Sequence, residues 1–160
     1  MRRGILLFLA GLAIGELGPL EWVTWRVVAA RLPAIKSQSL AAPSPFQSLP
    51  HSRWIAESPN AYVIEDPYDA QAPVHLLVIP KQRYTSLLEA PPELLGEMLV
   101  VARTAAAERG IAESGFRLIV NTNPHGAQTT YHLHMHVLGG AQQTWPLLPY
   151  LRGHLLAATE

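Results

Sequence analysis

The chain has 160 residues, with 12 acidic and 12 basic side chains, so its formal net charge is zero. This balance gives no reason to expect a surface for polyanions, and the length is that of one domain with an adequate core. The sequence contains no cysteine, which excludes disulfides, thiolate metal ligands and a cysteine nucleophile without fixing the redox compartment.

The N-terminus has a basic start followed by an apolar run. Arg2 and Arg3 precede residues 4–15, which carry no charge, in the layout of a signal peptide's first two regions. The run is shorter than the roughly 20 residues that cross a bilayer. Residues 20–32 then place two Trp side chains among apolar ones, as in an interfacial helix.

We therefore predict that residues 1–32 form a hydrophobic helix that serves as an uncleaved membrane anchor. A cleaved export signal and an ordinary helix packed on the domain or on a partner are the alternatives. The protein is accordingly expected to be membrane-associated or exported rather than cytoplasmic. Residues 33–50 are rich in Ser, Pro, Ala and Gln and nearly uncharged, which is typical of a linker. The catalytic domain, with a C-terminal tail, is then predicted over residues 51–160.

Short apolar runs predict strands at residues 61–65, 74–80 and 116–121. Residues 87–110 carry apolar side chains at helical spacing, with prolines suited to the first turn and a glycine suited to the end.

Residues 131–138 alternate strictly between polar and apolar side chains, which is the period of a β-strand. His132, His134 and His136 are therefore expected on one face of that strand, with the intervening apolar residues directed into a core. Each buried imidazole brings a donor and an acceptor that need partners. The histidine row therefore indicates a functional site more than a structural one. With this fourth strand, the element order predicts an α+β domain with an antiparallel sheet and a helix on one face.

Two kinds of chemistry fit the row. Imidazole is a common zinc ligand, so a metal-dependent hydrolase using the three strand histidines is one interpretation. In the other, the middle imidazole is a nucleophile and its neighbours position it and the substrate. Residues 122–130 form a loop of turn formers and small polar side chains, in which Gly126 allows close backbone approach to an anion. Because no Cys or Asp lies near the row to complete a common zinc set, we favour a histidine nucleophile beside a substrate phosphate.

Several motifs resemble the histidine-triad (HIT) nucleotide hydrolases and transferases, and within them the Hint branch of nucleotide phosphoramidases. They are Asn121, the segment 126–129, the His-x-His-x-His strand with the Val-Leu-Gly-Gly after it, and Trp145-Pro146. The phrase Gln-Ala-Pro-Val-His-Leu-Leu-Val-Ile-Pro-Lys at residues 71–81 is similar to the family's nucleotide-pocket strand. The resemblance covers about half of the chain, residues 61–146.

The resemblance implies a homodimer with a HIT-like fold that hydrolyses nucleoside 5′-phosphates carrying an amine or another leaving group. No metal, other cofactor or nucleic acid is required. His134 is expected to form a transient nucleotidyl-imidazole, with His132, His136 and His75 around it. Phosphate binding and loop support are assigned to Asn121, Gly126, Gln128 and Thr129. An Asp that binds the ribose precedes the Gln-Ala-Pro of the Hint pattern, and Asp66 takes this place here with one additional residue in the turn. A membrane-tethered nucleotide-binding adaptor is the non-enzymatic alternative.

Overall fold

The computed structural model describes residues 19–66 and 71–142. The chain divides into two compact units, residues 1–31 with 144–160 and residues 32–143. The second unit contains the sheet and all of the histidines discussed below.

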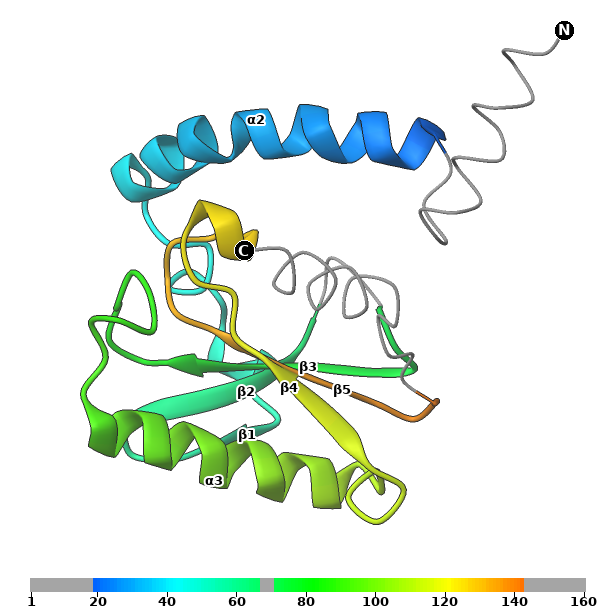
Figure 1. Ribbon diagram of the computed structural model, residues 1–160. Helices are drawn as coiled ribbons and strands as arrows, with labels where there is room; N and C mark the ends of the chain where they lie inside the picture. Colours follow the sequence, from blue (N-terminus) through cyan, green and yellow to red (C-terminus); the bar gives the residue numbers. More distant parts are fainter. Residues whose placement is uncertain (1–18, 67–70, 143–160) are drawn as a thin grey trace, which may run out of the picture. The chain divides into compact units, whose positions relative to one another are not determined.

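Five antiparallel strands form one sheet in the order β1-β2-β3-β5-β4 (Figure 1). The strands are β1 (Ala56–Glu57), β2 (Ala61–Glu65), β3 (Val74–Pro80), β4 (Phe116–Ile119) and β5 (Met135–Gly139). The four longer strands correspond to the predicted ones. The two-residue strand β1 was not predicted, because a run of two residues has no measurable period.

Helix α3 (Pro92–Glu108) covers one face of the sheet (Figure 1). It is shorter than the predicted helix because Pro91 is extended, with φ −67° and ψ 149°, and acts as the N-cap. Gly110 follows the last turn with φ +69°, a left-handed conformation that suits a glycine. The buried side of α3 comprises Leu94, Met98, Val101, Ala102, Ala105 and Ala106.

The two faces of the sheet belong to two apolar clusters. Ala61 and Val63 of β2 pack in the cluster that contains α3, whereas Tyr62 and Ile64 pack with Phe46. The side chains of β2 therefore alternate between the two faces of the sheet. The segment that contains Phe46 and precedes β1 covers the face opposite α3. The α+β class with an antiparallel sheet and a covering helix is confirmed.

Residues 33–50, predicted as a linker, instead belong to the second compact unit, which contains the sheet. Helix α2 (Pro19–Ala41) runs through Pro33, and after it Ser44 and Phe46 are buried. A proline inside a helix costs roughly 3 kcal/mol, so contacts elsewhere must stabilise these turns. Arg83 makes such contacts, because its guanidinium donates to the carbonyls of Ser39 and Ala42, at 2.7 and 2.9 Å. A cation is favourable at this end of a helix, where the last carbonyls have no partner within the helix.

The apolar run at residues 4–15 lies outside the described residues, as do Trp145-Pro146 and the tail. Within the two described ranges, no helix combines the length and apolar character needed to cross a bilayer.

Candidate active site

His75 and His136 come together across two neighbouring strands. The register of β3 and β5 pairs Leu77 with His136 and His75 with Leu138, which makes the two histidines diagonal neighbours on one face. Nε2 of His75 lies 2.9 Å from Nδ1 of His136, a hydrogen-bond distance. This is the face opposite α3, because the alternate residues Leu76 and Val137 pack in the α3 cluster.

His132 and His134 lie just before β5, which begins at Met135, so the predicted strand is too long at its start. The predicted separation of faces nevertheless holds. Leu133 packs in the α3 cluster, and the ring of Phe46 contacts the rings of His132 and His134, with centroids 5.6 and 5.3 Å apart. The His134 and His136 rings meet edge to face, with centroids 5.0 Å apart. The three histidines therefore share one side of the chain.

His132 bridges two parts of the fold that are distant in sequence. Its Nε2 lies 2.9 Å from the carbonyl oxygen of Pro80, which can only accept, so Nε2 carries the proton. Nδ1 then accepts from the hydroxyl of Ser44, whose Oγ is 2.7 Å away. Burial lowers the pKa of His132 to about 4 and keeps the imidazole neutral. His132 is thus fixed in one tautomer.

The same reasoning defines the tautomer of His134. Its Nδ1 lies 2.8 Å from the carbonyl oxygen of His132 and must donate to it. The proton therefore sits on Nδ1, and Nε2 holds a lone pair. Burial lowers the pKa of His134, although the hydrogen bond to the His132 carbonyl acts in the opposite direction. At neutral pH this is a neutral imidazole with one unprotonated nitrogen, the form in which histidine is a nucleophile.

The loop before the histidines is held from inside by Gln128, which is 1% exposed. Its side-chain oxygen accepts from the Asn123 N–H at 2.9 Å, and its amide donates to the Thr85 and Thr130 carbonyls at 2.7 and 3.1 Å. The backbone N–H groups of Gly126 and Gln128 both donate to the Asn123 carbonyl. A phosphate bound at these two N–H groups would therefore have to share them with the Asn123 carbonyl. Thr129, which is assigned to phosphate, is exposed, and Asn121, which is assigned to loop support, is half-buried.

Helix α2 also reaches this loop. Nζ of Lys36 lies 2.8 Å from Oδ1 of Asn123 and 5.3 Å from the centre of the Tyr131 ring. Ser39 accepts from the Tyr131 N–H at 2.8 Å, and Arg83 donates to the Tyr131 carbonyl at 3.0 Å. The sequence interpretation missed Lys36, Ser39, Ser44 and Arg83. The only signal for them in the sequence is a basic residue followed by residues with small hydroxyl side chains, before the first strand.

The structure does not arrange the three strand histidines around a common point. Both ring nitrogens of His132 contact protein groups, Ser44 and the Pro80 carbonyl, which leaves neither for a metal. Asp66, expected at the ribose, has its carboxylate oxygen Oδ2 3.3 Å from Nε2 of His75. The structure therefore brings His75 next to His136 of β5, and Asp66 next to His75.

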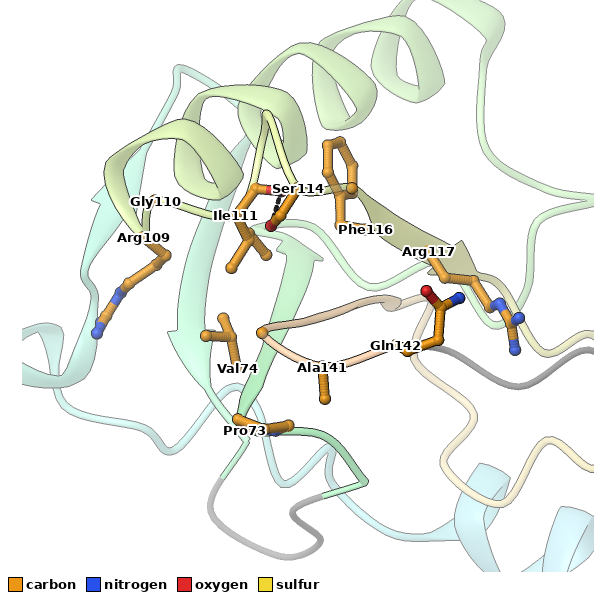
Figure 2. A pocket seen from close by; sticks show the side chains of 12 residues that line it. Pro73, Val74, Arg109, Gly110, Ile111, Ser114, Phe116, Arg117, Ala141 and Gln142 are labelled. Carbon is orange, nitrogen blue, oxygen red and sulfur yellow. Dashed lines mark hydrogen bonds between the residues drawn. The ribbon is translucent and has the colours of Figure 1, made fainter.

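A cavity of about 890 Å³ lies away from the histidines. The C-terminal end of α3, the loop to β4 and the residues after β5 form much of its lining, and Figure 2 shows Arg109 and Arg117 on opposite sides of it, on different elements. None of its lining residues is a histidine. Convergence of imidazoles, and not the volume of a cavity, therefore locates the candidate site.

Comparison with known proteins agrees with this geometry. Residues 50–143 match the model of the HIT domain, and the chain belongs to the HIT family. The expectation of a HIT-family hydrolase is confirmed at the level of the family.

The relatives include an uncharacterized HIT-like protein of Synechococcus elongatus, 53% identical over 48% of this chain and 68% of that protein. The purine nucleoside phosphoramidase of Escherichia coli is 48% identical over 51% of this chain and 67% of the enzyme. Adenylylsulfatase HINT1 of Arabidopsis thaliana is 40% identical over 56% and 69%, respectively. Among solved structures, a HIT family hydrolase from Legionella pneumophila is 35% identical and superposes with a TM-score of 0.55 over 70% of this chain and 95% of that one.

Proposed function

We propose that this protein hydrolyses nucleoside 5′-phosphoramidates, with His134 as the covalent nucleophile. The observation that carries the proposal is the hydrogen bond from His134 Nδ1 to the His132 carbonyl at 2.8 Å, because it leaves the lone pair on Nε2. The names of the relatives support the substrate class, since one is a purine nucleoside phosphoramidase and another an adenylylsulfatase.

In the first step, Nε2 of His134 attacks the phosphorus atom and the bond from phosphorus to the leaving nitrogen breaks. The departing amine takes a proton, and we propose as its donor the His75–His136 pair, whose two nitrogens share a hydrogen bond of 2.9 Å. In the second step, water attacks the nucleotidyl-imidazole, gives its proton to the same pair and releases the nucleoside 5′-monophosphate. His134 returns to its starting tautomer.

His132 contributes position in this mechanism. Its carbonyl oxygen orients His134, and its own ring is fixed between Ser44 and Pro80. The buried, neutral ring of His132 is poorly suited to proton transfer at neutral pH, since its pKa is about 4.

The test is turnover of adenosine and guanosine 5′-phosphoramidates by the full-length protein in the presence of EDTA. Release of the monophosphate and the amine is expected. His134→Ala is expected to lower kcat by at least about a thousandfold, since removal of a covalent nucleophile costs orders of magnitude. His51→Ala is the matched control, because the His51 side chain is 71% exposed and pairs with Glu57. Activity of His134→Ala above about a tenth of the wild-type value would refute the nucleophile.

The two alternative functions make different predictions in this assay. A metal-dependent hydrolase would lose activity in EDTA and regain it with zinc. A nucleotide-binding adaptor would bind nucleoside monophosphate with no turnover of any member of the substrate panel.

A homodimer and membrane attachment through residues 4–32 are also proposed. The dimer rests on the family resemblance, and β4 is an edge strand of the described sheet at which a second copy can pair. Sedimentation equilibrium of the full-length protein tests the dimer, and a concentration-independent monomer mass would refute it.

A further inference from the structure

Asn123, near the start of the loop 122–130, has a backbone conformation that residues with side chains rarely adopt. Its φ is +61° and its ψ is 177°, a region that is essentially restricted to glycine. Ala127, after the short helix η2 (Pro124–Gly126), is left-handed with φ +56° and ψ 29°. Within residues 19–66 and 71–142, no other residue except glycine has a positive φ. The backbone strain of the described fold is therefore concentrated in this loop.

A strained conformation persists only where the surrounding contacts hold it. The Asn123 N–H donates to Oε1 of Gln128 at 2.9 Å, and the Asn123 carbonyl accepts from the N–H groups of Gly126 and Gln128 at 3.1 and 3.2 Å. A glycine at position 123 could make all three of these contacts. The fourth contact requires the side chain, because Oδ1 of Asn123 accepts from Nζ of Lys36 at 2.8 Å.

Lys36 belongs to a side of α2 that holds both ends of the loop. Its half-buried ammonium also lies 5.3 Å from the centre of the Tyr131 ring, within the range of a cation–π contact. Ser39, three residues further along α2, accepts from the Tyr131 N–H at 2.8 Å. Residues three apart lie on one side of a helix. The loop is therefore attached to α2 near its start, through Asn123, and directly after its end, through Tyr131.

We propose that Lys36 is a positioning residue for the substrate phosphate, and that it acts by holding Asn123 and the loop 122–130 in one conformation before the substrate binds. A loop that is already ordered has a smaller entropy cost on binding, so affinity improves. The effect should fall on KM more than on kcat, because a separate contact, with the His132 carbonyl, orients His134. The effect on KM rests on the proposed function, whereas the attachment of the loop does not.

Amide hydrogen exchange of the full-length protein tests the attachment without any substrate. In Lys36→Met, which keeps the length of the side chain and removes the ammonium, peptides that cover residues 121–130 should exchange about tenfold faster, because a hydrogen bond from a charged group is lost. Ser37→Ala is the matched control on the same helix, since the Ser37 hydroxyl donates to the Pro33 carbonyl at an exposed position. It should leave the exchange of the loop unchanged. Circular dichroism verifies that both variants are folded, and Lys36→Gln replaces Lys36→Met if the latter is not.

Kinetics with a phosphoramidate then test the role in binding. Lys36→Met should raise KM about tenfold and change kcat less than about twofold, whereas Lys36→Arg, which still donates, should recover much of the loss. Asn123→Gly removes the acceptor and retains the three backbone contacts. In that background Lys36→Met should raise KM less than about twofold, because its partner is already absent. A tenfold effect that persists in Asn123→Gly would mean that Lys36 acts on the substrate directly, and would overturn the positioning role.

The remaining outcomes separate the parts of the proposal. Unchanged exchange in Lys36→Met, or an equal increase in Ser37→Ala, would overturn the attachment of the loop to α2. Faster exchange with an unchanged KM would overturn the contribution to binding. Absence of turnover in the wild type would refute the proposed function, and the exchange data would still decide whether Lys36 holds the loop.

Discussion

The hydroxyl oxygen of Ser44 lies 2.7 Å from Nδ1 of His132, and the two residues are 88 positions apart in the sequence. Because Pro80 engages the other ring nitrogen, this contact completes the fixation of the ring whose own carbonyl orients His134. A serine from the segment before the sheet thus contributes to the position of the candidate nucleophile without touching it.

Replacing Ser44 should therefore reduce both stability and turnover. In Ser44→Ala the buried Nδ1 of His132 loses its donor, and an unsatisfied buried acceptor costs about 1–3 kcal/mol of unfolding free energy. Urea denaturation measures this loss, and kcat for a phosphoramidate should fall with KM less affected. Ser48→Ala is the control, because Ser48 donates to the Pro45 carbonyl at an exposed position. Equal stability of the two variants would contradict the assigned role of Ser44.

The stability of the protein should depend on pH through His132. The folded pKa is about 4, against an ordinary value of 6.5, because burial disfavours the charged form. Between these values the unfolded chain binds a proton that the folded chain does not, so unfolding free energy decreases as the pH falls through this window. The contribution is complete above the ordinary value, and its loss over the whole window amounts to roughly 3 kcal/mol. The lowered pKa of His134 acts in the same direction.

Urea unfolding of the wild type and of His132→Gln at about pH 7 and about pH 4.5 measures this effect. Each protein is compared with itself, so a general loss of stability in the variant does not obscure the result. The difference between the two pH values should be smaller in His132→Gln. The same difference in both proteins would mean that other groups account for the pH dependence.

The N-terminal boundary of the active domain should lie before Ser44. A chain that begins at Leu32 keeps Lys36, Ser39 and Ser44 and should retain wild-type kcat/KM. A chain that begins at Pro45 loses the Ser44 hydrogen bond and the carbonyl partners of Arg83, and should lose at least about tenfold in kcat/KM, equivalent to about 1.4 kcal/mol. Assays of the two purified truncations decide the matter. Equal activities would mean that the segment is dispensable.

The location of the protein is tested by fractionation. If residues 4–15 insert into lipid and residues 20–32 lie at the interface, the full-length chain should sediment with membranes, and the chain that begins at Leu32 should not. Mass spectrometry verifies that the sedimented protein retains its N-terminus. Recovery of the intact chain in the supernatant would refute membrane attachment.

The site was predictable where the pattern was local. Alternation in residues 131–138 predicted which side chains share a face, and this held even where the chain leaves the β-ladder before Met135. Helical spacing predicted α3 in the same way. The contact between Ser44 and His132 was not predictable, because a serine in a segment rich in Ser, Pro and Ala has the local composition of a linker. Pro33 was equally misleading, since α2 continues through it and the contacts of Arg83 with the end of that helix come from far along the sequence.

Asp66 was assigned by analogy, and its role as a ribose ligand stays a prediction. The structure adds that its carboxylate oxygen lies 3.3 Å from Nε2 of His75. Counting along the sequence from the Gln-Ala-Pro motif identifies the residue but does not predict this contact.

The Ser44–His132 hydrogen bond also determines when the site can form during folding. Its partners are separated by 88 residues, and those of the Pro80 contact by 52, so both belong to the slow, non-local contacts of the fold. On the ribosome Ser44 emerges long before His132 is synthesised, so the ring of His132 cannot be fixed until both residues are present. If the proposed function holds, the nascent chain should therefore gain full activity only after β5 has left the exit tunnel.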